Sequence, residues 1–204
     1  MTEVAGVILA GGRATRMGGG DKGLRMLGGQ SLMDRVIARL APQCGAMALN
    51  ANGDPARFGD LGLPVLSDSL PDHPGPLAGV LAGLDWAAQM GVPAIVTAAA
   101  DTPFFPNDLV ARLQAAAGPS GLALAASPDD TGRMQRQPTF GLWPVDLRDE
   151  LRAALLGGLR KIVLWTDQHH AGTAEFSAQS YDPFFNINRP EDIAAAEALL
   201  AGQA

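Results

Sequence analysis

The 204-residue sequence is poor in cysteine, histidine and long apolar runs, and each shortage excludes a class of protein. A single cysteine, Cys44, cannot form an intrachain disulfide, so we expect a cytoplasmic protein in which Cys44 is a small core residue rather than a nucleophile. The three histidines lack the spacing of a zinc site. No apolar run reaches about 18 residues, which predicts no membrane span. The first apolar run, residues 4–9, follows no basic segment, so we interpret it as a strand rather than a signal peptide.

Charge is also scarce, and it is unevenly placed. Charged residues make up 18% of the chain and the formal net charge is −6, which argues against a nucleic-acid-binding protein. Residues 13–39 nevertheless carry six basic and two acidic side chains. A positive region in an acidic body suits a small anion better than a polymer. Arg35 and Arg39 fall on a predicted helix and have the simpler interpretation of surface charge.

The hydrophobic pattern alternates between buried strands and amphipathic helices, which predicts an α/β protein with a mostly parallel sheet. Ser31 is a candidate cap for the first helix, and Pro190 lies in the first turn of the last. The predicted strands are residues 4–9, 46–49, 64–66, 94–99, 122–126 and 139–143. Further helices are predicted for residues 106–116 and 146–155, and residues 77–88 form a helix with one apolar face. The polar stretch 127–137 is either a solvated loop or a mobile lid.

Candidate functional residues follow the predicted strands. Asn50, Asp68 and Asp101 each come directly after a strand, and a glycine-rich loop follows the first strand. Ligands of open α/β sheets collect at the carboxyl ends of the strands. Asn50 and Asp68 have a simpler interpretation as turn residues, and Asp101 as a helix cap, although it lies too far from the next helix to cap it.

The stretch "GVILAGGRATRMGGGDKG", residues 6–23, is the most informative part of the chain. It lacks the Gly-Lys-Ser/Thr of a P-loop, because Lys22 is followed by Gly23. Gly18-x-Gly20-x-x-Gly23 matches a dinucleotide fingerprint literally, but it begins too long after the strand. Gly11 and Gly12 remove side chains at the end of the strand, so that backbone N–H groups can approach phosphate or a base. Two cations separated by such a loop, Arg16 and Lys22, can bracket a triphosphate.

The segments "LAGGRATRMGGGDKG", "NAN", "DSLPDHPGPLAGVLAGL", "ADTPF", "RQPTFGL" and "FFNINRPEDI" occur in an order that resembles the molybdenum cofactor guanylyltransferases, which are nucleotidyltransferases of GT-A-like fold. The resemblance covers essentially the whole chain. It implies a single domain, residues 1–204, with a three-layer α/β/α sandwich and a mostly parallel Rossmann-like sheet. The nucleotide-binding half would span residues 1 to about 110, and the acceptor-binding half would follow it.

The resemblance also implies a reaction and its residues. GMP would pass from GTP to molybdenum-molybdopterin, with Mg²⁺ as the cofactor and pyrophosphate as the leaving group. The implied catalytic residues are Arg16, Lys22 and Asp101, with Asp101 as the magnesium ligand. The implied GTP-binding residues are Leu9, Ala10, Gly11, Gly12, Lys22, Asn50, Asp68 and Asp101. No general base is needed, because the attacking phosphate is already an anion.

Three points stay open at this level. Family members often have Gly-Lys-Pro-Leu where this chain has residues 29–32, so we assign no phosphate role to position 30. Asn186 and Asn188 could bind the second substrate or the metal, and Asn188 could equally cap the last helix. Gly11 leaves room for a purine edge, whereas cytidine-specific relatives tend to have alanine there, but this remains a hypothesis.

The alternatives are a cytidylyl- or sugar-nucleotide transferase of the same fold, a non-catalytic nucleotide-binding or cofactor-delivery protein, and an NAD(P)-dependent oxidoreductase. The last alternative predicts a helix that starts at the glycine loop. We expect a monomer without nucleic-acid or membrane partners. The resemblance adds transient contacts with proteins that supply molybdopterin or accept the cofactor.

Overall fold

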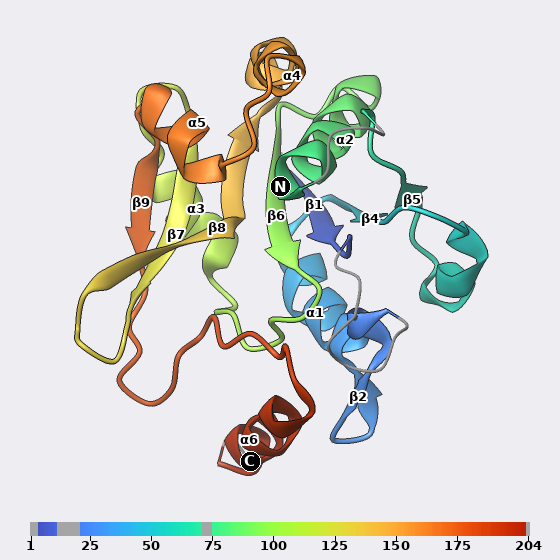
Figure 1. Ribbon diagram of the computed structural model, residues 1–204, viewed down its shortest axis with the longest axis vertical. Helices are drawn as coiled ribbons and strands as arrows, with labels where there is room; N and C mark the ends of the chain where they lie inside the picture. The colour runs from blue at the N-terminus through green and yellow to red at the C-terminus, as the bar shows by residue number, and fades with distance from the viewer. Residues whose placement is uncertain (1–3, 12–20, 71–74, 203–204) are drawn as a thin grey trace.

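A seven-stranded sheet forms the middle layer of the protein in the computed structural model, which describes residues 4–11, 21–70 and 75–202 (Figure 1). The strand order is β5-β4-β1-β6-β8-β7-β9. The strands are β1 (Val4–Leu9), β2 (Met26–Leu27), β3 (Gln30–Ser31), β4 (Ala46–Asn50), β5 (Val65–Leu66), β6 (Ala94–Ala99), β7 (Ala123–Pro128), β8 (Met134–Pro144) and β9 (Gly172–Glu175). The helices are α1 (Leu32–Leu40), α2 (Pro76–Gln89), α3 (Leu109–Ala115), α4 (Arg148–Leu156), α5 (Ile162–Gln168) and α6 (Pro190–Ala201).

The strand directions confirm the predicted, mostly parallel sheet. β1 runs parallel to β4 and β6, β4 runs parallel to β5, and β7 runs parallel to β9. β8 is antiparallel to both of its neighbours, β6 and β7. The carboxyl ends of β5, β4, β1 and β6 therefore lie along one edge of the sheet.

Helices cover both faces of the sheet, because its central strands are apolar on both sides. α1 and α3 contribute buried residues such as Val36 and Leu113 to the core on one face. α2, α4 and α5 contribute residues such as Leu81, Leu151 and Trp165 to the core on the other. All six residues of β1 are buried between these layers. The predicted three-layer α/β/α sandwich is thus confirmed.

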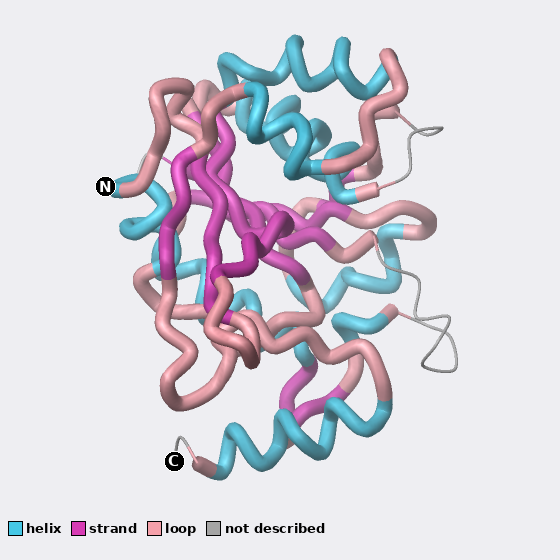
Figure 2. Tube along the Cα trace, turned by 60° about the vertical axis from the view of Figure 1, so that its left-hand side comes forward, coloured by secondary structure: helices cyan, strands magenta, loops and turns pink. Residues whose placement is uncertain are grey.

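The α6 helix lies across one end of the molecule, against the short β2–β3 hairpin (Figure 2). Leu27 and Leu32 pack there with Phe104 and with Ile187 and Ala196 from the end of the chain, and all five are buried. This third apolar cluster brings the segment before α6 next to the segment before β2.

Several local predictions need correction. Part of the polar stretch 127–137 is not a loop: residues 127–128 and 134–137 belong to the strands of a β7–β8 hairpin, and residues 129–133 form its exposed turn. β8 therefore begins at Met134 rather than at residue 139. Asp129 organises the turn by accepting hydrogen bonds from Thr131 and Gln135, and these bonds lower its pKa to about 2. The helix predicted for residues 106–116 begins later, at Leu109.

The remaining local features agree with the sequence or add to it. Ser31 caps α1 as predicted, in a capping box with Asp34. Burial raises the pKa of the Cys44 thiol to about 12, which fits a core residue and not a nucleophile. Within the described residues, no helix has both the length and the apolar character needed to cross a membrane.

Candidate nucleotide-binding and catalytic site

The site is built around the carboxyl end of β1, which is held between its two neighbouring strands. The backbone N–H of Ala10 donates to the carbonyl oxygen of Asn50 at 2.9 Å, on the β4 side. On the β6 side, the N–H of Ala100 donates to the carbonyl oxygen of Leu9 at 3.1 Å. Leu9 is buried, Ala10 is half-buried and Gly11 is exposed, so the chain emerges from the core at the start of the glycine loop.

Beyond β4 and β5, two amides surround one carboxylate. Asn50 Nδ2 donates to Asp68 Oδ1 at 3.0 Å, and Asn52 Nδ2 donates to Asp68 Oδ2 at 2.7 Å. Asn52 Oδ1 in turn accepts from the backbone N–H of Asp68 at 2.9 Å. We call these three residues the β4–β5 cluster. The two residues predicted here, Asn50 and Asp68, come together, and Asn52, which the sequence analysis did not select, joins them.

Asn50 reaches Asp68 because helix α2 has no side chain at Gly79. Asn50 is only 4% exposed, and its Nδ2 also donates to the carbonyl oxygen of Leu66 at 3.1 Å. A Cβ atom at Gly79 would stand 2.8 Å from Asn50 Cγ, nearer still to its Oδ1, and 3.0 Å from a methyl carbon of Leu9. Atoms cannot approach so closely without a shift, so the glycine makes space for the amide.

On the β6 side, Lys22 joins two segments that are remote in sequence. Lys22 Nζ lies 3.3 Å from Asp101 Oδ2 and 2.5 Å from Asn188 Oδ1. The side chains of Lys22 and Asp101 are each 18% exposed. We call Lys22, Asp101 and Asn188 the β6 cluster. An ammonium group has three N–H donors, so these two contacts are compatible with a third to a phosphate oxygen.

The segment before α6 carries Asn188 into this cluster. The backbone N–H of Ile187 donates to the carbonyl oxygen of Asp101 at 2.9 Å, and the Ile187 side chain is fully buried. Arg189, not Asn188, is the N-cap of α6, and Asp192 Oδ2 accepts from the backbone N–H groups of both residues. The Asn188 side chain is therefore directed to Lys22 and does not cap the helix. Asn186 is exposed.

A salt bridge connects the segment of Lys22 with the β4–β5 side. Arg57 Nε lies 3.0 Å from Asp21 Oδ2, and the same guanidinium group donates to the carbonyl oxygen of Asn52. The Arg57 side chain is 35% exposed and the Asp21 side chain 20%. Asp21 directly precedes Lys22, so Arg57 neutralises a carboxylate next to the lysine of the site.

Other predicted residues have different positions. Gly12 and Arg16 lie outside the described residues, as do Gly18 and Gly20 of the dinucleotide fingerprint. Within residues 21–70, which the structure describes, Lys22–Leu24 form a 3-10 turn and no α-helix begins before Leu32. The oxidoreductase alternative, which requires a helix at this loop, is therefore wrong. Arg35 and Arg39 have structural roles on α1, where they donate to the backbone carbonyls of Leu27 and Phe105.

The donor set around Asp101 fits a metal that is shared with a substrate. No group of three or more His, Cys, Asp or Glu side chains that could hold a metal occurs in the ranges 4–11, 21–70 and 75–202. Mg²⁺ is typically held by one or two carboxylates together with substrate phosphates and water. The Asp101 carboxylate and the Asn188 amide oxygen both contact Lys22 Nζ, so one carboxylate and one neutral oxygen lie close together. Such a pair suits a metal that also binds substrate phosphates.

Sequence reasoning missed Asn52 and Arg57 and left Asn188 undecided. Asn52 had a usable signal, because "NANGD" places a second amide two residues after the first at the end of a strand. Arg57 and Asn188 act through partners that are 36 and 166 positions away, Asp21 and Lys22. No local spacing reveals such contacts.

Comparison with known proteins shows the family of the chain. The model of the family described as "MobA-like NTP transferase domain" matches residues 6–171. A molybdenum cofactor guanylyltransferase of Nitrobacter hamburgensis is 52% identical over 201 residues, which cover 96% of this chain and 94% of that protein. A molybdenum cofactor guanylyltransferase of Bradyrhizobium sp. (strain ORS 278) is 51% identical over 205 residues, covering 98% and 94%.

Solved structures at lower identity share the fold. Molybdopterin-guanine dinucleotide biosynthesis protein A from Archaeoglobus fulgidus is 24% identical with a TM-score of 0.70, covering 98% of this chain and 100% of that one. A 2-C-methyl-D-erythritol 4-phosphate cytidylyltransferase from Thermus thermophilus is 22% identical with the same TM-score of 0.70 and covers 98% and 100%. At these identities the likeness supports the architecture alone.

Proposed function

The chain belongs to the molybdenum cofactor guanylyltransferase family, and from this premise we propose which of its residues transfer GMP from GTP to molybdenum-molybdopterin. The products are molybdopterin guanine dinucleotide and pyrophosphate. One observation supports the assignment most strongly. Two polar clusters flank the end of β1 at the same edge of the sheet, one beyond β4 and β5 and the other beyond β6.

We propose that the nucleotide lies across the end of β1, with its base toward the β4–β5 cluster and its phosphates toward the β6 cluster. Guanine presents N–H donors on its Watson–Crick edge, and the Asp68 carboxylate provides acceptors. Lys22 provides the positive charge that a triphosphate requires. Gly11 has no side chain to shield its backbone, and a Cβ placed there would meet no heavy atom within 4 Å in the described structure. The space beside this backbone is therefore open to the nucleotide.

The chemistry requires alignment and charge neutralisation more than covalent help. A phosphate oxygen of molybdopterin attacks the α-phosphorus of GTP, and the bond from that phosphorus to the bridging oxygen breaks as pyrophosphate leaves. We propose that Lys22 binds the phosphates and neutralises charge on the departing pyrophosphate. Asn188 holds the ammonium group in place. Arg16, in the sequence stretch between Gly12 and Lys22, is proposed as a second cation for the triphosphate.

We propose Asp101 as the residue that holds Mg²⁺ together with the nucleotide phosphates. When bound, the ion supplies Lewis-acid neutralisation of phosphate charge. The 3.3 Å contact of Asp101 with Lys22 supports this role, since it puts the carboxylate beside the cation that is assigned to the phosphates. The half of the chain after residue 110 is proposed to bind the acceptor. We also propose a cytoplasmic monomer that contacts molybdopterin-supplying or cofactor-accepting proteins transiently.

Calorimetric titration with GTP, CTP and ATP, each with and without Mg²⁺, tests the proposal, together with a pyrophosphate-release assay that depends on molybdenum-molybdopterin. We expect selective GTP binding that weakens without Mg²⁺. Asp101→Asn should lower kcat by about a hundredfold or more. Asp108→Asn, which changes an exposed carboxylate just before α3, is the matched control and should be neutral. Full turnover by Asp101→Asn, or preferred binding of CTP, would contradict the assignment.

A further inference from the structure

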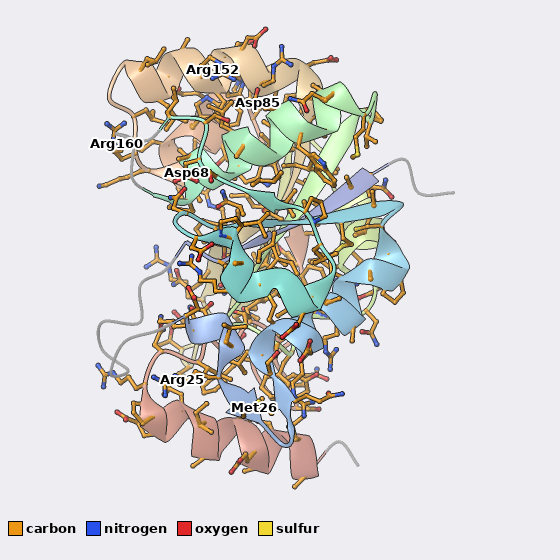
Figure 3. All side chains as sticks on the ribbon, turned by 90° about the vertical axis from the view of Figure 1, so that its right-hand side faces the viewer. Arg25, Met26, Asp68, Asp85, Arg152 and Arg160 are labelled. Atoms are coloured by element: carbon orange, nitrogen blue, oxygen red, sulfur yellow. The ribbon has the colours of Figure 1, made fainter. Side chains whose placement is uncertain are left out.

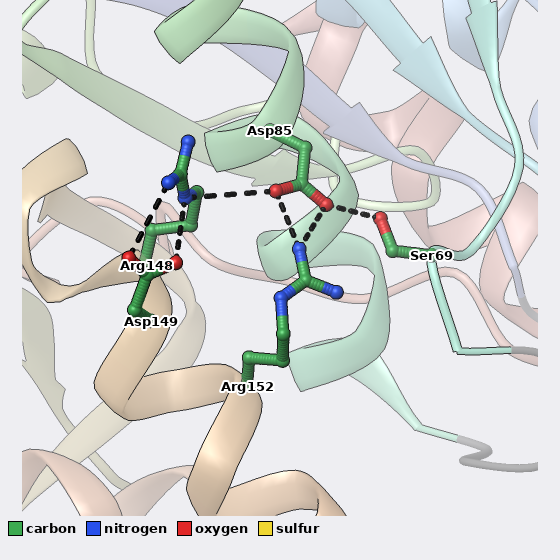
Figure 4. Close-up of polar contacts among 5 residues, drawn as sticks. All are labelled: Ser69, Asp85, Arg148, Asp149 and Arg152. Atoms are coloured by element: carbon green, nitrogen blue, oxygen red, sulfur yellow. Dashed lines mark hydrogen bonds and ion pairs between the residues drawn. The ribbon is translucent and has the colours of Figure 1, made fainter.

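One carboxylate outside both clusters joins three parts of the protein. Asp85, on α2, accepts a hydrogen bond from Ser69 Oγ to its Oδ2 at 2.5 Å. Arg152 Nη2, on α4, donates to its Oδ1 and Oδ2 at 2.6 and 2.8 Å. Arg148 Nε lies 3.8 Å from Oδ1 and also pairs with Asp149 (Figure 4).

Asp85 stands out on its helix. It is the one charged residue in the fourteen of α2, PLAGVLAGLDWAAQ, and nine of these residues are buried. Its side chain is 24% exposed. A carboxylate at the edge of such an apolar layer loses hydration, which its partners must offset. The two arginines do so from the α4 side, and Ser69 uses the same carboxylate from the other side.

Ser69 matters because it follows Asp68. β5 is only two residues long, Val65–Leu66, so the strand itself gives the segment 67–70 little support. Asp68 reaches Asn50 and Asn52, while the next residue, Ser69, reaches α2. In the view of Figure 3, Asp68 lies below Asp85 and Arg152.

We propose that Asp85 is a positioning residue: through Ser69 it fixes the segment that presents Asp68 to GTP. This inference rests on the proposed function, because it assigns Asp68 to the nucleotide. The Ser69–Asp85 contact fixes one side of the segment and the β4–β5 cluster fixes the other. Without the Ser69–Asp85 contact, the side-chain contacts of Asp68 with the described residues are those to Asn50 and the exposed Asn52. GTP binding must then order the segment itself.

A second consequence concerns α4. Arg148 and Arg152 belong to the half of the chain that we assign to the acceptor, so Asp85 connects that half to the nucleotide side. A role restricted to packing α4 on α2 would make Asp85 important for thermal stability alone. The two roles differ in one measurable quantity: only positioning changes the affinity of the folded protein for GTP.

The test uses full-length Ser69→Ala, Ser69→Thr, Asp85→Ala and Asp68→Ala. Asp149→Asn is the control, since Asp149 pairs with Arg148. For each variant, Tm, the Kd for GTP and the KM values for GTP and acceptor are measured. We expect Ser69→Ala and Asp85→Ala each to raise KM and Kd for GTP by about three- to tenfold, the effect of one lost hydrogen bond. The value of kcat and the acceptor KM should stay within about twofold. Ser69→Thr, which keeps the hydroxyl, should restore GTP affinity.

The double variant gives a sharper result. If both residues act through one contact, the Kd for GTP of Ser69→Ala combined with Asp85→Ala should be no higher than the higher of the two single-variant values. A lower Tm with unchanged GTP affinity in Ser69→Ala would overturn the inference and leave the proposed function intact, provided that Asp68→Ala still weakens GTP binding. Unchanged GTP binding in Asp68→Ala would overturn the role of Asp68 and this inference with it.

Discussion

Replacing Gly79 by alanine should harm this protein although alanine is the better helix former. In an ordinary helix interior the change gains about 1 kcal/mol. Here the new Cβ would stand 2.8 Å from Asn50 Cγ and 3.0 Å from a Leu9 methyl carbon. Overpacking costs about 1–3 kcal/mol, and a buried amide that loses its partners costs about as much again. We therefore expect a net destabilisation of at least about 1 kcal/mol.

Gly79→Ala should also weaken the interaction with GTP. A displaced Asn50 no longer donates to Asp68, so the KM for GTP should rise. A destabilisation of this size should lower Tm by about 2–4 °C or more in a domain of this length. Thermal unfolding and steady-state kinetics with GTP as the varied substrate measure the two effects.

Gly83→Ala, one turn further along α2, is the matched control. Its added Cβ would meet Ile95 Cδ1 at 2.8 Å and Val7 Cγ2 at 2.9 Å, so it overpacks the core without touching the site. Its Tm should fall and its KM for GTP should not change. In an Asn50→Ala background, the cost of Gly79→Ala should largely disappear. A Gly79→Ala variant with wild-type Tm and KM would refute the steric argument.

Three further outcomes are expected. Gly11→Ala should leave Tm unchanged, since no described heavy atom lies within 4 Å of the added Cβ, and should reduce the preference for GTP over CTP in competition binding; an unchanged preference would remove the support for Gly11 as a base-selecting position. Arg57→Ala should raise the KM for GTP by exposing the charge of Asp21 to the triphosphate, and Asp21→Asn should cancel this effect; a persistent effect in the double variant would mean that Arg57 contacts the nucleotide directly. Asp129→Asn should lower Tm at pH 7, because folding lowers the pKa of the wild-type carboxyl from 3.8 to about 2. The stability that this carboxylate contributes is present above pH 3.8 and is lost as the pH falls through about 2. The melting curves of the two proteins should therefore converge at low pH.

The central strands and the residues at their ends were predictable from sequence for one physical reason. A strand buried on both faces must be continuously apolar, as Val4–Leu9 and Ala94–Ala99 are. Once the strands are parallel, the residues that follow them share an edge of the sheet. Asn50, Asp68 and Asp101 could therefore be assigned to one region before the structure was known.

The outer elements could not be predicted so well. β8 begins with exposed polar residues, and its first part is a strand because it pairs with β7, not because of its own pattern. β9 is four residues long, and Gly172–Glu175 offers no alternation of buried apolar residues. β2 and β3 have two residues each; they pair with each other, and β2 packs against α6 and β3 against α1. Such elements are stabilised by tertiary contacts, and the local sequence pattern does not reveal those contacts.

Contacts between side chains that are remote in sequence could not be predicted either. Ser69 and Asp85 lie 16 positions apart, and Lys22 and Asn188 lie 166 apart. Within their own segments these residues look ordinary. Ser69 is a serine in a turn, Asp85 is an aspartate on a helix, and Asn188 precedes a helix. Only the fold makes them partners.

The contact between Lys22 and Asn188 also determines an order of events during synthesis. A ribosome delivers the chain from its N-terminus, so the β4–β5 cluster, Lys22 and Asp101 all emerge while Asn188 is still to be made. Ile187, whose burial against the β2–β3 hairpin brings Asn188 to the lysine, is also made late. On the roles proposed above, every residue assigned to the base is therefore translated before the residue that holds Lys22 in place.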